Sequence, residues 1–308
     1  MDKQVKVVII AIGIIIPISA ILVWSSNQSI SSPIIQTNEQ KITAIASFWP
    51  LYEFTKQVGK DKVDVSIIVP FGVEPHDWEP TVKDLQRLQQ ADLVIINGVG
   101  FENWVHDFES IEPNVVIVDT SNGISIIEEL DEHDDHESFG DPHIWLNPVM
   151  AQKQVANIAD ALIEIDPTNE NYYNNNANSY IEKLDVLDKK ITNELSMCEK
   201  KDFIAFHEAF SYFADQYGLN QHTILESTDP HSEPTSRNLE NVINLAKNLD
   251  LNVIFTEETV DIRTSEVIAN EINGKVLVLS PLEIGDDNTS YIEKMEQNLL
   301  HLKEALCN

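Results

Sequence analysis

Three histidines occupy positions where α/β proteins commonly place ligand-binding side chains, just after a strand or just before a helix. His76 follows the apolar run Val63–Val69, His143 precedes a helical pattern, and His207 comes directly after Phe203–Phe206. Because they are far apart in the sequence, a local zinc-finger spacing is excluded, and a common site requires tertiary folding. Taken singly, each histidine is more often an ordinary hydrogen-bonded residue, since neutral imidazole both donates and accepts.

Two of these histidines lie in turns of the same design. One turn reads Glu-Pro-His-Asp-Trp-Glu-Pro from Glu74 to Pro80, and the other reads Asp-Pro-His-Ile-Trp-Leu-Asn-Pro from Asp141 to Pro148. In both, a proline restricts the backbone next to the histidine, and a tryptophan follows two positions later. A rigid turn presents the imidazole in a fixed direction, which favours a role as a ligand over that of an ordinary surface residue.

The start of the chain predicts export. Lys3 and Lys6 precede an apolar stretch, Val7–Trp24, which is followed by a polar segment. At about 1.5 Å per residue this stretch is just long enough to cross a bilayer. No small-residue cleavage site stands out and no cysteine follows. We therefore expect an uncleaved anchor on the outer face of the cytoplasmic membrane, or a periplasmic or extracellular protein if the signal is cleaved.

The net charge of −31, with 51 acidic residues, excludes nucleic acid as a partner. A cationic ligand suits such a chain better, although acidity is also a general means of keeping a protein soluble. Cys198 and Cys307 are too far apart for a metal-binding pair, and in an exported protein two leftover thiols often form a disulfide. Whether these two sulfurs meet depends on the fold.

After residue 40, segments rich in Val and Ile alternate with helical patterns, which is typical of mostly parallel sheets flanked by helices. The expected strands are Ile42–Ser47, Val63–Val69, Leu93–Ile96, Val115–Val118, Phe203–Phe206, Val253–Thr256 and Val276–Leu279. The expected helices include Pro80–Gln90, Glu208–Tyr217, Arg237–Leu249, Thr264–Ile272 and Ser290–Ala305. This α/β pattern occurs twice, which predicts two lobes.

A long amphipathic helix separates the two lobes. Its apolar residues recur at steps of three and four: Ala177, Ile181, Leu184, Leu187, Ile191 and Leu195. Asp166 and Pro167 offer an N-cap and a first-turn proline at its start. The predicted segments are thus an anchor (1–27), a flexible tether (28–40), an N-terminal lobe (41–165), a connecting helix (166–197) and a C-terminal lobe (198–308), with the ligand site in the cleft between the lobes.

Four strings resemble the zinc- and manganese-binding solute receptors of ABC transporters: Ala46–Leu51, Gly72–Pro80, Asp141–Trp145 and Phe206–Phe210. The resemblance covers nearly everything after the tether, in the right order. It implies a metal in the cleft, with His76, His143 and His207 as its ligands and a permease as the partner. Members with His at the third position resemble zinc receptors, whereas manganese receptors tend to carry Glu there. Three imidazoles also suit Zn²⁺ better than Mn²⁺, which prefers oxygen.

The fourth ligand departs from the family pattern. Relatives usually have Asp in a Leu-Asp-Pro-Leu string, where this chain reads Leu-Ser-Pro-Leu with Ser280, whose neutral hydroxyl is a poor zinc ligand. Our candidate is Glu257, at the end of strand Val253–Thr256, with water or Ser280 as alternatives. Support of another ligand through a hydrogen bond is an equally good interpretation of Glu257.

The segment from Glu128 to Gly140 consists almost wholly of acidic residues and histidine, and we interpret it as a surface loop. His133 and His136 resemble a shortened form of the His-rich loop of zinc-binding members. One hypothesis is that this loop gathers zinc and passes it inward. A solvated acidic loop without such a role is an equal alternative.

The sequence therefore predicts a monomeric, extracytoplasmic receptor, not an enzyme, that captures Zn²⁺ and delivers it to an ABC-type importer. An exported zinc hydrolase is the first alternative, because three histidines and an open position also form catalytic sites. However, the residue at 211 is Ser211, so the His-Glu-x-x-His motif that His207 begins is incomplete. A manganese receptor or a surface adhesin, a role attached to some members of the family, are further alternatives.

Overall fold

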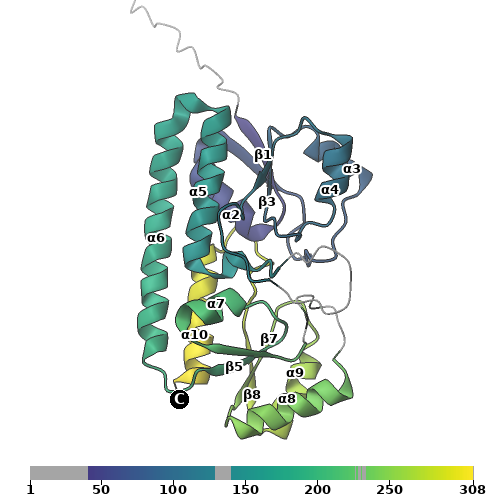
Figure 1. The fold of residues 1–308 in the computed structure, drawn as a ribbon, viewed down its shortest axis with the longest axis vertical. Helices are drawn as coiled ribbons and strands as arrows, with labels where there is room; N and C mark the ends of the chain where they lie inside the picture. Colours follow the sequence, from purple (N-terminus) through teal and green to yellow (C-terminus); the bar gives the residue numbers. More distant parts are fainter. Residues whose placement is uncertain (1–40, 129–139, 226, 228–229, 231–233, 308) are drawn as a thin grey trace, which may run out of the picture. The chain divides into compact units, whose positions relative to one another are not determined.

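The computed structural model describes residues 41–128, 140–225, 227, 230 and 234–307. Lys41–Asn308 form one compact unit, and the two predicted α/β lobes are both present in it (Figure 1). The predicted anchor and tether lie outside the described residues. Among the described residues, no helix has the length and apolar character needed to cross a membrane. The boundaries at 165/166 and 197/198 stay predictions, because the contacts within Lys41–Asn308 do not divide it further.

The first lobe is built on a four-stranded parallel sheet in the order β2-β1-β3-β4. The strands are β1 (Ile42–Ala46), β2 (Val63–Ile67), β3 (Leu93–Ile96) and β4 (Ile117–Asp119), and the helices are α2 (Trp49–Gly59), α3 (Val82–Leu88) and α4 (Val105–Ile111). The four predicted strands of this lobe are confirmed, with small differences at their ends. Helix α2 was not predicted, and it is buried on most of its surface.

Two long helices run side by side along the molecule (Figure 1). Helix α5 (Pro148–Ile165) begins at Asn147, whose Oδ1 accepts the backbone N–H groups of Val149 and Met150. Helix α6 (Glu170–Ser196) confirms the predicted connecting helix and starts after a short 3₁₀ turn, Pro167–Asn169. Its buried residues recur at steps of three and four: Tyr173, Ala177, Tyr180, Leu184, Leu187, Ile191 and Leu195.

The second lobe contains two small parallel sheets where one sheet was expected. Strand β5 (Asp202–Ala205) pairs with β6 (Asn220–Thr223), and β7 (Val253–Thr256) pairs with β8 (Lys275–Val278). Strand β6 was missed because its sequence, Asn-Gln-His-Thr, contains no apolar residue. The helices of this lobe are α7 (Ser211–Tyr217), α8 (Ser236–Asn248), α9 (Ile262–Glu271) and α10 (Tyr291–Leu306).

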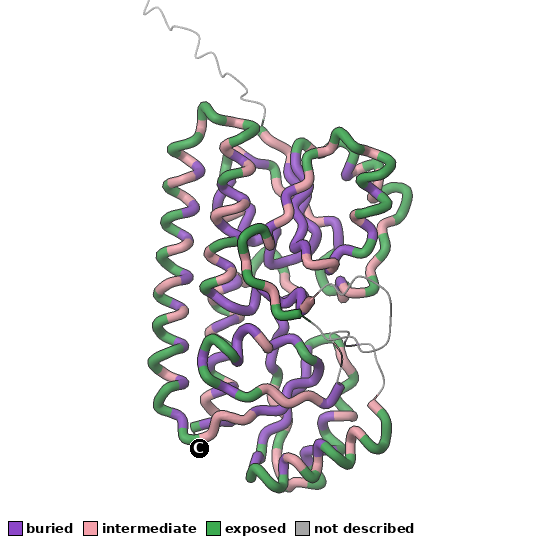
Figure 2. Tube along the Cα trace, in the orientation of Figure 1, coloured by how far each residue is buried: buried purple, intermediate pink, exposed green. Residues whose placement is uncertain are grey.

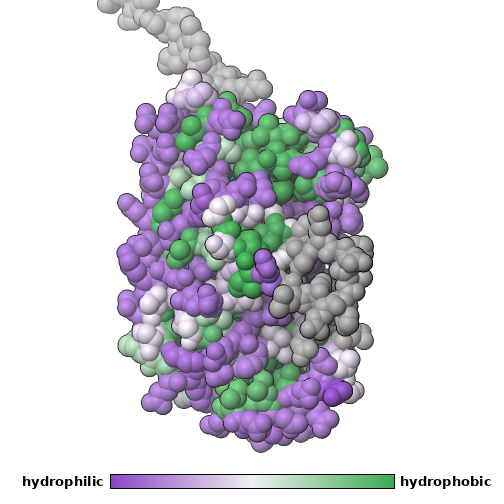
Figure 3. Space-filling model, viewed as in Figure 1, coloured by the Kyte–Doolittle hydropathy of each residue, from purple (hydrophilic) through white to green (hydrophobic). Residues whose placement is uncertain are grey.

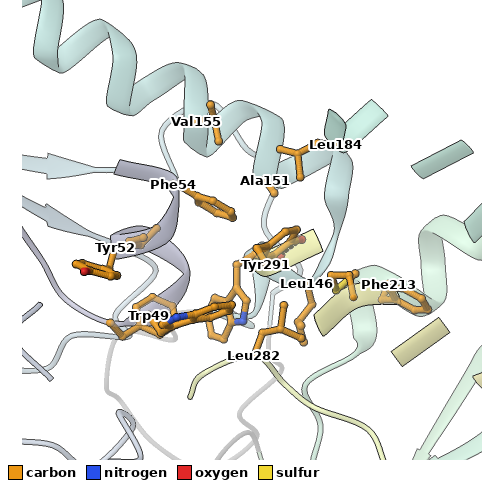
Figure 4. Packing of buried hydrophobic residues seen from close by; sticks show 14 of the residues in the cluster. Trp49, Tyr52, Phe54, Leu146, Ala151, Val155, Leu184, Phe213, Leu282 and Tyr291 are labelled. Carbon is orange, nitrogen blue, oxygen red and sulfur yellow. Dashed lines mark hydrogen bonds between the residues drawn. The ribbon is translucent and has the colours of Figure 1, made fainter. Parts of the chain in front are cut away.

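One main hydrophobic core includes residues of both lobes and of the long helices. Buried positions follow the strands and the inner faces of α5 and α6 (Figure 2). In Figure 4, Phe54 of α2 lies against Tyr291 of α10, with ring centroids 5.0 Å apart, and Leu282 lies close by. A smaller core lies among β5, β7, α8 and α9. Because the main core is continuous between the lobes, opening the cleft widely would expose apolar surface to water.

The two cysteines form a disulfide, Cys198–Cys307, with their Cα atoms 4.3 Å apart. It joins the segment just after α6 to the residue that ends α10. The disulfide therefore fastens α10 to the end of the long connecting helix.

The outer face of α6 is covered mainly by hydrophilic side chains (Figure 3).

Candidate metal centre

The turn between β2 and α3 positions His76. The carboxylate of Glu74 accepts the backbone N–H of His76, at 3.0 Å to Oε1, and the intervening Pro75 is buried. The imidazole lies edge-on to the ring of Phe101, with centroids 4.9 Å apart. The His76 side chain is 11% exposed, and its Nε2 atom lies 3.1 Å from Oε1 of Glu283. Pro75, the hydrogen bond to Glu74 and the contact with Phe101 thus direct the imidazole of His76 inward.

His143 caps a short 3₁₀ helix, Ile144–Leu146, just ahead of α5. Oδ1 of Asp141 lies 2.9 Å from the backbone nitrogen of His143 and 2.8 Å from its Nδ1. The residue is fully buried. Burial disfavours the charged imidazole, but hydrogen bonds to Asp141 and Glu283 outweigh it and raise the pKa of His143 to about 9.

His207 is the second residue after β5, and Glu257 directly follows β7, so the carboxyl ends of these two strands bring the residues together. Nδ1 of His207 lies 2.6 Å from Oε1 of Glu257, and the backbone N–H of His207 points at the same oxygen at 3.3 Å. Both side chains are buried. Glu257 thereby fixes both the backbone and the ring of His207.

The turn after β8 supplies a buried carboxylate, Glu283. Leu282, just before it, has a φ of 59°, a backbone conformation that is uncommon for leucine, and its N–H donates to Oγ of Ser280. Full burial of Leu282 holds this turn in place. Burial would raise the pKa of the Glu283 carboxyl, but the neighbouring imidazoles, His76 foremost, hold it well below its ordinary value.

Together, His76, His143, His207 and Glu283 offer one ligand atom each, and these four atoms lie within 4.8 Å of one another. Oε1 of Glu283 is 3.1, 3.4 and 3.8 Å from Nε2 of His76, His143 and His207, respectively. The Nε2 atoms of His143 and His207 are 3.3 Å apart. A tetrahedral zinc ion with bonds of about 2.0–2.1 Å separates its ligand atoms by about 3.3 Å. The four separations given above, 3.1–3.8 Å, lie close to this spacing.

Residues 45–305 match the family whose description is ZnuA, zinc-uptake complex component A, periplasmic. The chain belongs to this family. The match takes in both lobes and all four residues of the group, so the predicted resemblance to metal-binding solute receptors and the two-lobed fold are confirmed.

Individual relatives agree with the ZnuA assignment. The high-affinity zinc uptake system protein ZnuA of Bacillus subtilis is 39% identical over 303 residues, which cover 93% of this chain and 94% of that protein. The zinc-binding lipoprotein AdcA of Streptococcus pneumoniae is 34% identical over 281 residues, covering 86% of this chain but only 56% of AdcA. The solved Zn(II)-bound ZnuA-like domain of that AdcA has a TM-score of 0.76 at 31% identity, covering 87% of this chain and 100% of that domain.

Hydrogen-bond chemistry explains why the group suits a cation. Ionised carboxylates only accept, so Asp141 and Glu257 require the Nδ1 atoms of His143 and His207 to be the donors. In the neutral imidazoles, each Nε2 then carries a lone pair directed at the other ring and at Glu283. Such converging lone pairs repel one another unless a proton or a metal ion lies between them. The carboxylates on Nδ1 are the outer partners that metal-binding histidines usually have.

The structure places the predicted site residues as follows. His76, His143 and His207 come together as expected. Glu257 was our candidate for the fourth position, but it lies on the Nδ1 side of His207, outside the group of four, and Glu283 is the carboxylate in that group. Ser280 does not join the group either, since its hydroxyl accepts the backbone N–H of a nearby leucine.

Sequence reasoning missed Glu283 although a signal was present. The string in which relatives carry Asp ends only one residue before it, so the same turn supplies a carboxylate three residues after Ser280. His133 and His136, the predicted zinc-gathering residues, lie outside the described residues. Their proposed role stays a prediction.

Proposed function

We propose that this member of the ZnuA family captures Zn²⁺ outside the cytoplasm and delivers it to an ABC-type importer. The observation that carries the proposal is the convergence of three imidazole nitrogens and one carboxylate oxygen, which lie within 4.8 Å of one another. Membership of a family described as a zinc-uptake complex component, and relatives named as zinc uptake proteins, support the same function.

In this proposal His76, His143, His207 and Glu283 each bind zinc through one atom. Nitrogen-rich tetrahedral coordination suits Zn²⁺, whereas Mn²⁺ prefers a larger number of oxygen ligands. Four protein ligands also fill the tetrahedron. A catalytic zinc site keeps an open position for water or substrate, so the closed set favours a carrier over a hydrolase.

The release of zinc follows from the fact that the two lobes each supply two of the proposed ligands. His76 and His143 come from the N-terminal lobe, whereas His207 and Glu283 come from the C-terminal lobe. A change in the angle between the lobes would lengthen bonds on one side of the ion and leave it with an incomplete set of ligands. Docking on a permease that favours the opened form would thus release the zinc.

The apolar stretch Val7–Trp24 is proposed to anchor the receptor, as a monomer, on the outer face of the membrane. The family description as a periplasmic component agrees with export. The geometry of the group of four bears on metal binding alone, so the adhesin alternative is not part of the proposal.

Metal titration of residues 41–308 tests the function. We expect one tightly bound zinc ion per chain, which excess manganese does not displace. Substitution His207→Ala should weaken zinc binding by at least about 10-fold. His222→Ala is the matched control, because His222 is also paired with a carboxylate, Asp202, but lies outside the group. Equal zinc affinity in the wild type and the His207 variant, or displacement of zinc by manganese, would contradict the proposal.

A further inference from the structure

The segment Asp141–Asn147, which carries His143, is tied by two hydrogen bonds to the start of α7 in the second lobe. The hydroxyl of Tyr212 donates to the backbone carbonyl of Asp141 at 2.7 Å. The backbone carbonyl of Tyr212 accepts the side-chain amide of Asn147 at 3.2 Å. Tyr212 is buried. A single residue of α7 therefore holds both ends of this segment.

Asp141 connects the Tyr212 hydrogen bond to His143. Its Oδ1 atom is the acceptor for both the backbone N–H and the Nδ1–H of His143. Its own N–H donates to the carbonyl of Ile127 at 2.9 Å, and the N–H of Ile127 donates to the hydroxyl of Tyr212 at 3.0 Å. With the bond from Tyr212 to Asp141, these two form a closed ring of three hydrogen bonds that joins Tyr212, Asp141 and Ile127. A shift of Asp141 would therefore turn the imidazole of His143.

Tyr212 is also closely connected to His207. The N–H of Ala209 donates to the carbonyl of His207, and the N–H of Phe210 donates to Oε1 of Gln221 on β6 at 2.6 Å. These bonds fix the short stretch between His207 and Tyr212 to the second lobe. The Tyr212 hydroxyl thus couples the loop of His207 to the turn of His143, whose Nε2 atoms lie 3.3 Å apart.

His76 is held by different contacts. Its backbone is fixed by Glu74 and its ring by Phe101, on the turn after β2. It is also the most exposed of the four residues of the group. The hydrogen bonds of Tyr212 with Asp141, Asn147 and Ile127 hold the segment of His143, whereas Glu74 and Phe101 hold His76.

We propose that Tyr212 is a positioning residue that sets the separation of His143 and His207 before zinc arrives. These two ligands and Glu283 then form a prepared part of the site, and His76 completes it. Preparing the ligands in advance lowers the cost of ordering them on binding, which strengthens the affinity. The inference rests on the proposed function, because it assigns Tyr212 a role in zinc binding.

The substitution Tyr212→Phe removes only the oxygen that makes these contacts. We expect zinc affinity to fall by about 10-fold, at the low end of the range for residues that support metal ligands. Tyr217→Phe is the matched control, since Tyr217 is a buried residue of the same helix whose hydroxyl donates to Asp188 of α6. The control should stay within about twofold of the wild type.

Combining variants separates positioning from a general loss of stability. The effect of Tyr212→Phe should persist in a His76→Ala background and disappear in a His143→Ala background, where no ring remains to be positioned. Wild-type affinity in the Tyr212 variant would overturn the proposal. An equal loss in the two backgrounds would do the same.

Nuclear magnetic resonance of the imidazole nitrogens, recorded without metal, provides a readout that does not depend on zinc. Tyr212→Phe should shift the signals of His143 and leave those of His76 in place. Unchanged His143 signals would overturn the positioning role even if the wild type binds zinc. Conversely, the Tyr212→Phe variant could show shifted His143 signals while the wild type binds no zinc. That pair of results would refute the proposed function and leave the positioning of His143 standing.

Discussion

The Nδ1 atom of His207 lies 2.6 Å from Oε1 of Glu257, and both residues are buried at the carboxyl ends of neighbouring strands. The carboxylate can only accept, so it fixes which ring nitrogen of His207 carries the proton. Nε2 of His207 then carries a lone pair that is directed at His143 and Glu283. In the proposed site, Glu257 therefore supports the metal through His207.

Glu257→Leu should weaken zinc binding by about 10- to 100-fold, because the ring of His207 loses the partner that fixes its tautomer and orientation. The neighbouring Glu258→Gln is the control, since Glu258 binds Lys294 near the surface. Competition against a chelator of known affinity measures both. Equal zinc affinities for the two variants would contradict the role given to Glu257.

Glu283→Ala removes a proposed ligand and should lower zinc affinity by at least about 10-fold. Cobalt(II) substitution should also show a changed visible spectrum, because the number or type of ligands changes. Ser280→Ala should leave the spectrum unaltered, since Ser280 lies outside the group. A normal spectrum in the Glu283 variant, together with an altered one in the Ser280 variant, would restore Ser280 as the fourth ligand.

The resemblance to metal-binding solute receptors named the three histidines of this centre, and the local sequence supports their placement. His76 and His143 lie in proline-restricted turns, and His207 follows a strand whose apolar residues identify it. The buried stripe of α6 likewise follows directly from the spacing of its apolar residues. Each of these features depends on neighbours in the sequence.

Glu283 and Glu257 could not be assigned in the same way. Among 51 acidic residues, nothing in the type of residue separates a buried carboxylate from an exposed one. Glu283 lies beside His76 after a turn in which Leu282 adopts a positive φ, and Glu257 meets His207 because β5 and β7 are in contact. Both facts depend on tertiary packing.

Zinc binding should strengthen as the pH rises towards about 9. The pKa of His143 is raised to about 9 in the metal-free fold, so below that pH zinc must displace its proton. This single proton alone gives about a tenfold rise in affinity per pH unit, which levels off above the pKa. Calorimetry in buffers of different ionisation heat would count the protons released. An affinity that is flat between pH 7 and pH 9 would contradict this expectation.

The same raised pKa predicts how the stability of the metal-free protein depends on pH. Because the pKa of His143 is higher in the folded state than its ordinary value of 6.5, its proton stabilises the fold fully below that value. The contribution is lost as the pH rises through about 9. Denaturant unfolding without metal should therefore show stability falling across this range. A rise in stability there would refute the direction assigned to His143.

Loss of the disulfide should lower stability without changing the zinc site. Cys198 and Cys307 are separated by 109 residues in sequence, and closing a loop of this size stabilises a fold by about 4–5 kcal/mol in the chain-entropy model. The double substitution to serine should lower the melting temperature and keep the zinc affinity, because neither cysteine belongs to the group of four. An unchanged melting temperature would show that the bond does not stabilise the fold.

Anomalous diffraction at the zinc absorption edge, from crystals of residues 41–308 grown with zinc, tests the central claim most directly. The account predicts one strong peak, about 2.0–2.1 Å from Nε2 of His76, His143 and His207 and at a similar distance from a carboxylate oxygen of Glu283. A peak bound by other residues, or one that leaves any of the three imidazoles uncoordinated, would contradict it.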